Sequence, residues 1–237
     1  MAARRRIRPR ARCGRWGTIS VSLLIATANP AKAREFRQML AGIAVVPARG
    51  GAPFLDLSAF PAVTAVEETG QTFLQNACLK AAGYARQTGA DWTLADDSGL
   101  EIDALGGAPG VYSARWAARR GLVPPTANAD ADNNATVLQE LADVPPDRRQ
   151  ARFVCVLALA DSVGQIIATV RGSIEGMLLR EPRGNNGFGY DPLFFVPKCG
   201  KTTAELPPAE KHRISHRGQA LARLSEIIAE RKWADLL

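Results

Sequence analysis

The chain has 237 residues, 46% of them apolar and 22% charged, a length and composition that suit one large globular domain or two closely joined lobes. The formal net charge is +7, but residues 1–15 hold seven arginines and no acidic residue, and without them 23 basic residues face 23 acidic ones. The basic excess therefore belongs to the terminal segment, and we expect neither nucleic-acid binding by the folded part nor a membrane partner.

The N-terminal segment allows two interpretations. An arginine-rich start, the apolar residues 19–25 and Ala26-Thr27-Ala28 together imitate a secretory signal with its cleavage site. The apolar run is short for such a signal and far too short to span a membrane, and cleavage would remove the first expected core strand. We therefore predict a disordered extension over residues 1–17, a single domain over 18–237, and a cytoplasmic protein.

Cysteine and histidine spacing argues against structural cross-links. The four cysteines lie far apart in the sequence: Cys13, Cys78, Cys155 and Cys199. No pair has zinc-site spacing, so free thiols in a reducing compartment are favoured over a secreted disulfide protein. His212 and His216 are spaced like a zinc-protease pair, but Arg213 stands where that motif places its glutamate, which disfavours zinc.

In the first half of the chain, apolar patterning predicts two helices between short strands. Residues 19–26 are expected to form a buried strand, followed by a helix that Asn29 caps and Gly42 ends. A second helix is expected over 69–86, where alanines repeat every four residues. A short strand over 92–95 is expected to end in a turn at Asp96-Asp97-Ser98-Gly99.

The second half adds a strand cluster. A helix is expected around Val137–Leu141, and a final helix from near Ser215. Residues 151–160, 165–171 and 173–179 predict three successive strands, and residues 193–196 predict another. Strand–helix alternation followed by a strand cluster predicts an α/β protein with a mixed sheet.

The turn after the first strand has the geometry of an anion site. Thr27, Asn29 and Lys32 supply a hydroxyl, an amide and a cation where a helix begins, and helix N-termini present free backbone N–H groups. The segment lacks the glycine pattern of a P-loop or a dinucleotide site. An ordinary capped helix explains the same residues.

Two acidic segments are candidates for a metal site. Asp96 and Asp97 are adjacent carboxylates that repel one another unless a cation lies between them, and oxygen-only ligands suit Mg²⁺. Both can reach one site only if the backbone turns, as Gly99 allows. Glu68 is expected in the first turn of the second helix, above a polar stripe of Asn76 and Lys80. An acidic surface turn and a helix-dipole contact are the simpler alternatives.

Two later segments suit nucleotide binding. Residues 185–192 combine glycines, which let a ligand approach the backbone, with aromatic rings such as Phe188 that can stack on a base. Lys211 and the sequence Ser215-His216-Arg217-Gly218 place donors at the expected start of the last helix. A plain glycine-rich loop is the alternative for the first segment.

Taken in order, these motifs strongly resemble the inosine/xanthosine triphosphate pyrophosphatase family over about residues 19–230. They are TANPAK at 27–32, EETG at 67–70, ADDSGL at 95–100, GGAPG at 106–110 with SAR at 113–115, GFGYDP at 187–192 and SHRG at 215–218. The resemblance implies an elongated two-lobed α/β fold with a long mixed central sheet, a cytoplasmic homodimer, Mg²⁺ dependence, and hydrolysis of ITP, dITP and XTP to a monophosphate and pyrophosphate.

The resemblance also implies roles for matching residues. Asp97 is the expected general base and, with Glu68, a metal ligand. The expected substrate-binding residues are Thr27, Ala28, Asn29, Pro30, Ala31, Lys32, Ser98, Phe188, Gly189, Tyr190, Asp191, Lys211, His216 and Arg217. Ala28 departs from the family's usual glycine, and a positive φ there would cost about 1 kcal/mol.

Two other function classes stay open from the residues alone. The carboxylates could serve a phosphatase or nuclease acting on other phosphate esters. The arginine-rich tail could make the chain a nucleotide- or nucleic-acid-binding module.

Overall fold

The computed structural model describes residues 22–40 and 54–230. The predicted extension over residues 1–17, Cys13 and the predicted helix stop at Gly42 lie outside the described residues. Among the described helices, none has the length and apolar character needed to cross a membrane.

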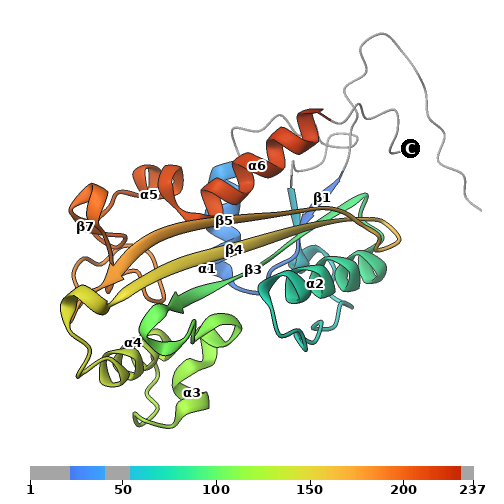
Figure 1. The fold of residues 1–237 in the computed structure, drawn as a ribbon. Helices are drawn as coiled ribbons and strands as arrows, with labels where there is room; N and C mark the ends of the chain where they lie inside the picture. Colours follow the sequence, from blue (N-terminus) through green and yellow to red (C-terminus); the bar gives the residue numbers. More distant parts are fainter. Residues whose placement is uncertain (1–21, 41–53, 231–237) are drawn as a thin grey trace, which may run out of the picture.

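A seven-stranded mixed sheet forms the centre of the molecule, in the order β2-β1-β3-β4-β5-β6-β7 (Figure 1). The strands are β1 Leu23–Ile25, β2 Phe54–Asp56, β3 Trp92–Ile102, β4 Gln150–Asp161, β5 Ile166–Leu178, β6 Phe194–Val196 and β7 Lys201–Thr202. Strand β1 is parallel to both of its neighbours, and all other pairs are antiparallel. The α/β class with a mixed sheet is confirmed.

Helices cover both faces of this sheet (Figure 1). They are α1 Pro30–Leu40, α2 Phe73–Thr88, α3 Trp116–Arg120, α4 Ala129–Glu140, α5 Pro208–Ile214 and α6 His216–Glu230. Helix α2 packs on one face of β3 and β4, while α1 and α6 share a core with the other face. Helices α3 and α4 cover the far end, so the long strands β3 to β5 connect two lobes.

The core follows the alternation of strand side chains. Along β3, Ala95 packs toward α2, whereas Leu94 packs toward α1 and α6. Leu100 and Ile102 enter the core of the second lobe with Trp116 of α3. A fully buried leucine or isoleucine side chain contributes about 1.5–3 kcal/mol to folding. Strand β3 thus stabilises the core on both faces of the sheet and in the second lobe.

The predicted turn at Asp96–Gly99 is wrong. Strand β3 continues through these residues because it pairs with β4 along its whole length, with Asp96 opposite Leu157 and Asp97 opposite Val156. Consecutive strand side chains point to opposite faces, so the two aspartates lie on opposite sides of the sheet. Their carboxylates therefore have different close partners, Lys32 for Asp96 and Lys80 for Asp97.

The predicted break at residue 172 is also wrong, because β5 is one strand. A Cβ on Gly172 would lie 2.5 Å from the backbone nitrogen of Ala220, so this glycine allows α6 to lie close to the strand. Glycine here marks close packing rather than a turn.

Helix boundaries differ from the predictions in two places. Helix α2 begins four residues later than expected, because Thr72 and Gln75 form a reciprocal capping box at its start. Glu68 therefore precedes the helix and lies outside its first turn, where the helix dipole would have stabilised its charge. The final helix expected from near Ser215 is confirmed as α6, which begins at His216, but Lys211, expected at its start, lies in the separate short helix α5. Sequence patterning missed β2 and the short helical segment 110–120.

Gly99 allows that segment to lie against β3. A Cβ on Gly99 would lie 2.6 Å from the carbonyl oxygen of Gly110 and would overlap the Ser113 hydroxyl. That hydroxyl accepts a hydrogen bond from Leu100 N at 2.8 Å and donates to Gly110 O at 2.6 Å. The contact leaves no space for a larger residue.

We expect Gly99→Ala to destabilise the fold by about 1–3 kcal/mol, because backbone and Ser113 must both move. Urea unfolding followed by circular dichroism measures the loss. Unchanged stability would contradict the close contact between β3 and the segment.

Candidate active site

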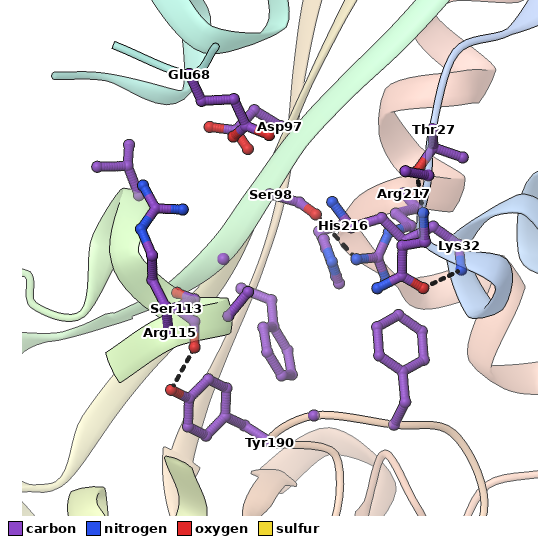
Figure 2. A pocket seen from close by; sticks show the side chains of 18 of the residues that line it. Thr27, Lys32, Glu68, Asp97, Ser98, Ser113, Arg115, Tyr190, His216 and Arg217 are labelled. Atoms are coloured by element: carbon purple, nitrogen blue, oxygen red, sulfur yellow. Dashed lines mark hydrogen bonds between the residues drawn. The ribbon is translucent and has the colours of Figure 1, made fainter. Parts of the chain in front are cut away.

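The candidate site is a cavity of about 300 Å³ at the carboxyl end of β1 (Figure 2). Strand β1 pairs with β3 only as far as Leu94. In the described part of the chain, no strand continues this edge of β3 beyond that point until a single bridge joins Glu101 to Pro109. Ligands of open α/β sheets bind in such crevices outside strand ends.

Most of the predicted site residues line this cavity. Those that line it are Thr27, Ala28, Asn29, Lys32, Glu68, Asp97, Ser98, Phe188, Gly189, Tyr190, Asp191, His216 and Arg217. Pro30 and Ala31 form the first turn of α1 and are not among the lining residues. Lys211 is buried behind the lining, with its ammonium 5.4 Å from the centre of the Phe188 ring.

The turn before α1 is organised by Asn29. Its Oδ1 accepts hydrogen bonds from the backbone nitrogens of Ala31 at 2.9 Å and Lys32 at 3.1 Å, so the predicted N-cap is confirmed. The Asn29 nitrogen in turn donates to Thr27 Oγ1 at 3.2 Å. The expected free N–H groups of this turn are therefore largely used internally, which leaves side chains and the helix dipole to attract an anion.

Glu68 and Asp97, predicted as ligands of one metal ion, both lie beside the ammonium of Lys80. The Lys80 ammonium lies 3.3 Å from Glu68 Oε1 and 3.3 Å from Asp97 Oδ1. Asn76 Nδ2 donates to Asp97 Oδ2 at 3.2 Å, and Asn76 Oδ1 accepts from Gly70 N at 2.8 Å. The polar stripe on α2 thus holds both the aspartate and the loop that carries Glu68.

The electrostatics of this pair favour a bound cation. Burial raises the pKa of Asp97, and the Glu68 charge adds to the rise against the opposing effects of Lys80 and Lys32. Burial alone would lower the pKa of Lys80, but the three carboxylates around it raise it instead. Lys80 therefore stays charged between two carboxylates that would otherwise repel one another.

Asp96, on the opposite face of β3, holds the cationic side of the site. Lys32 Nζ lies 2.8 Å from its Oδ2, which also accepts from Ser98 Oγ at 3.0 Å. Burial opposes ionisation, but Lys32, Arg217 and Lys80 lower the pKa of Asp96 to about 2. It is a permanent anion that positions Lys32 and Ser98.

A buried ion network extends from there to the glycine-rich loop. Arg217 donates to Ser98 Oγ at 2.9 Å and to Glu35 Oε2 at 3.1 Å. Lys211 Nζ lies 2.9 Å from Glu35 Oε1 and 2.6 Å from Asp191 Oδ2. Sequence reasoning missed Glu35, although it follows Lys32 by three residues and so shares its face of α1.

Asp191 shapes the loop that carries Phe188. Its Oδ2 accepts from Phe188 N at 2.8 Å, and its Oδ1 accepts from Thr203 Oγ1 at 2.7 Å. The Phe188 ring faces the guanidinium of Arg217, whose Cζ lies 5.0 Å from the ring centre. The ring is thus held where it can stack on a flat ligand.

Helix α4, which sequence reasoning did not connect with the site, fixes the same loop. Asp130 Oδ2 accepts from Gly189 N at 2.7 Å, and Asn134 Nδ2 donates to Gly189 O at 2.9 Å. Both polar groups of one glycine are therefore satisfied by side chains one helical turn apart. No sequence signal marks these partners, which lie more than 50 residues from Gly189.

Comparison with known proteins assigns the chain to a family, since residues 23–227 match the Ham1 family. The chain belongs to this family. It is 48% identical over 204 residues to a dITP/XTP pyrophosphatase of Exiguobacterium sibiricum, covering 86% of this chain and 95% of that protein. A dITP/XTP pyrophosphatase of Thermus thermophilus is 47% identical over 206 residues, covering 87% and 91%. The resemblance to this class of pyrophosphatases is confirmed.

Solved Ham1-family structures share the fold. A HAM1 protein from Coxiella burnetii aligns with a TM-score of 0.75 at 41% identity, covering 89% of this chain and all of that one. A nucleoside-triphosphatase, or dITP/XTP pyrophosphatase, from Mycobacterium abscessus aligns with a TM-score of 0.64 at 41% identity, covering 87% of this chain and 99% of that one. The chain therefore spans essentially the whole length of its relatives.

His216 of this Ham1-family chain is held neutral. Its ring is 4% exposed and stacks on Phe153 with centres 5.0 Å apart. Burial lowers the pKa of His216 well below 6.5, and the charges of Arg217, Lys211 and Lys32 lower it further. Among the described residues, its Nδ1 and Arg217 Nε have no hydrogen-bond partner. Both residues line the cavity, where a ligand can supply one.

We expect this histidine to make stability depend on pH. Below about pH 6.5 this histidine binds a proton in the unfolded chain but stays neutral in the folded one. As the pH decreases, the free energy of unfolding therefore decreases by up to about 1.4 kcal/mol per pH unit. Urea unfolding between about pH 7 and 5 should show a steeper fall for the unchanged chain than for His216→Gln. His212→Gln, at a half-buried histidine, should change the slope less, and equal slopes for all three would contradict the assignment.

Proposed function

We propose that this chain hydrolyses the deaminated purine nucleotides dITP, ITP and XTP to the nucleoside monophosphate and pyrophosphate. One observation carries the proposal: a single cavity joins the Glu68–Asp97 pair, the cationic turn at Lys32 and the aromatic loop at Phe188. Those are the three parts that a nucleoside triphosphate requires, namely a cation site, a phosphate site and a base site. The names of the relatives support the same substrates.

Glu68 and Asp97 fit Mg²⁺, which we propose as the cofactor. Lys80 at 3.3 Å from each carboxylate shows that the pair already attracts a positive charge. No group of three or more metal-ligating side chains occurs among residues 22–40 and 54–230, and Mg²⁺ suits a site of two carboxylates because it keeps water and takes phosphate oxygens as its other ligands. When bound, the ion would offset negative charge on the phosphates.

In the proposed reaction, the oxygen of a water molecule bonds to the α-phosphorus. The bond from that phosphorus to the oxygen bridging to the β-phosphate breaks, and pyrophosphate leaves. Asp97 orients the water and takes its proton, a role to which its raised pKa is suited, and a positioned base contributes about 10²–10⁴-fold to such a step. Lys32 and the N-terminal end of α1 stabilise charge on the phosphates.

Base choice follows from the unpaired donors beside the Phe188 loop. Hypoxanthine and xanthine present an oxygen at C6, which His216 or Arg217 can satisfy, whereas adenine presents an amino group that cannot accept. Leaving a buried donor unpaired costs about 1–3 kcal/mol, which corresponds to about 5-fold to 150-fold discrimination. Thr27, Ala28 and Ser98 would complete the contacts to sugar and phosphates from the sheet side of the cavity.

We further propose a cytoplasmic homodimer, as the family resemblance implies. The three described cysteines, Cys78, Cys155 and Cys199, are free thiols, which suits a reducing compartment. Analytical ultracentrifugation of the full chain tests the dimer, and a single monomeric species at micromolar concentration would contradict it.

Product analysis tests the activity. With Mg²⁺, we expect pyrophosphate and monophosphate from ITP, dITP and XTP at rates well above those for ATP and GTP, and little turnover when Mg²⁺ is removed with a chelator. Ion chromatography distinguishes pyrophosphate from orthophosphate. Release of orthophosphate instead would point to a phosphatase, and removing residues 1–17 should leave the activity unchanged.

We expect Asp97→Asn to lower kcat for ITP by about 10²–10⁴-fold, because the amide cannot take the proton from water. The fold, monitored by circular dichroism, should stay intact, since asparagine keeps the shape of the side chain. Asp147→Asn, at an exposed aspartate that does not line the cavity, is the matched control. Near-normal kcat in Asp97→Asn would remove Asp97 from this role.

A further inference from the structure

We propose that Arg115 is a further substrate-binding residue, whose guanidinium contacts phosphate oxygens of the triphosphate. The inference rests on the proposed function and names a group in the same cavity. Arg115 ends the short helical segment Gly110–Arg115 and lines the cavity. Its side chain extends along the wall that faces the Thr27–Lys32 turn, toward Glu68 and Asp97 (Figure 2).

Arg115 differs from the other cations at the site because it has no carboxylate partner. Lys32 is paired with Asp96, Lys80 with Glu68 and Asp97, and Arg217 with Glu35. Among the described residues, Arg115 forms no ion pair, and its guanidinium lies only over the ring of Tyr112, 5.3 Å from the centre. Its charge is therefore available to a ligand.

The other charged groups of the cavity show why the free positive charge of Arg115 matters for binding a triphosphate. Without Arg115, the charged groups that line the cavity are Lys32, Lys80, Arg217, Glu68, Asp97, Asp130 and Asp191. Acidic groups outnumber cations in this set, and the cations are engaged by carboxylates. A triphosphate therefore needs positive charge beyond that of Lys32 and a bound Mg²⁺, and a guanidinium binds phosphate oxygens through two parallel hydrogen bonds.

The backbone on both sides of Arg115 is held in place. Asn133 of α4, only 3% exposed, accepts from Ala117 N at 2.8 Å and donates to Ala114 O at 3.2 Å. The Tyr190 hydroxyl donates to Ser113 O at 2.8 Å. A side chain carried by such a fixed segment loses little freedom on binding, which favours affinity.

Helix α4 connects this wall to the base loop. Asn133 holds the segment that carries Arg115, while Asp130 and Asn134 on the same helix hold Gly189. Helix α4 therefore holds both the segment of the proposed phosphate contact and the loop of the proposed base contact, which fixes the distance between them.

Binding of inorganic tripolyphosphate, which lacks base and sugar, tests the proposal directly. Titration calorimetry with Mg²⁺ should give a dissociation constant at least about tenfold higher for Arg115→Gln than for the unchanged chain, since a charge-assisted contact is lost. Arg115→Lys, which keeps the charge without the fork, should lie between them. Arg119→Gln is the matched control, because Arg119 also stacks on Tyr112, 3.9 Å from its centre, but does not line the cavity.

Steady-state kinetics distinguishes a phosphate contact from a purely structural role, because the two have different effects on KM across substrates. Arg115→Gln should raise KM for ITP, XTP and GTP by the same factor, leaving base discrimination unchanged. Unweakened tripolyphosphate binding by Arg115→Gln, equal weakening by Arg119→Gln, or no measurable binding by the unchanged chain would each overturn the proposal. Failure of the unchanged chain to release pyrophosphate from any purine triphosphate would refute the proposed function separately.

Discussion

The site depends on a difference in length between two paired strands. Strand β1 has three residues and β3 has eleven, so β3 extends beyond its neighbour with one edge free of strand pairing in the described chain. Antiparallel pairing with β4 along the other edge runs the whole length of this extension and holds its backbone in place. Asp97 and Ser98 are therefore presented from a fixed strand to a cavity that strand pairing would otherwise fill, and rigid strands hold reacting groups more accurately than loops.

Buried charge is the second organising feature. Removing an ion from water costs several kcal/mol, and that cost is offset only when good partners surround the ion. Glu35 is such a partner, because it pairs with both Lys211 and Arg217. Burial alone would raise the pKa of Glu35, but the charges of these two cations lower it. The partners come from α1, α5 and α6, far apart in the sequence. The network therefore makes the position of helix α1 and that of the loop carrying Phe188 mutually dependent.

Sequence reasoning located most of the cavity but not its geometry. The Asn29 cap and the aromatic loop at Phe188 follow from local signals that a single segment carries, whereas the pairing of Glu68 with Asp97 is expected from the family resemblance. The turn expected at Gly99 failed because glycine has two uses, backbone freedom and close packing, and the sequence does not say which applies. Glu35 and Asn133 were missed because their partners lie in distant segments, where single-sequence patterns carry no information.

Alternation along β3 has a consequence for acid strength. One peptide bond separates Asp96, whose pKa lies at about 2, from Asp97, whose pKa burial raises above its ordinary value. The two neighbours differ in pKa because the sheet places Asp96 beside Lys32 and Asp97 beside Lys80 and Glu68. A one-residue register slip of this strand would turn each aspartate to the other face of the sheet and separate it from these partners, so the pairing with β4 maintains the difference in pKa as well as the fold.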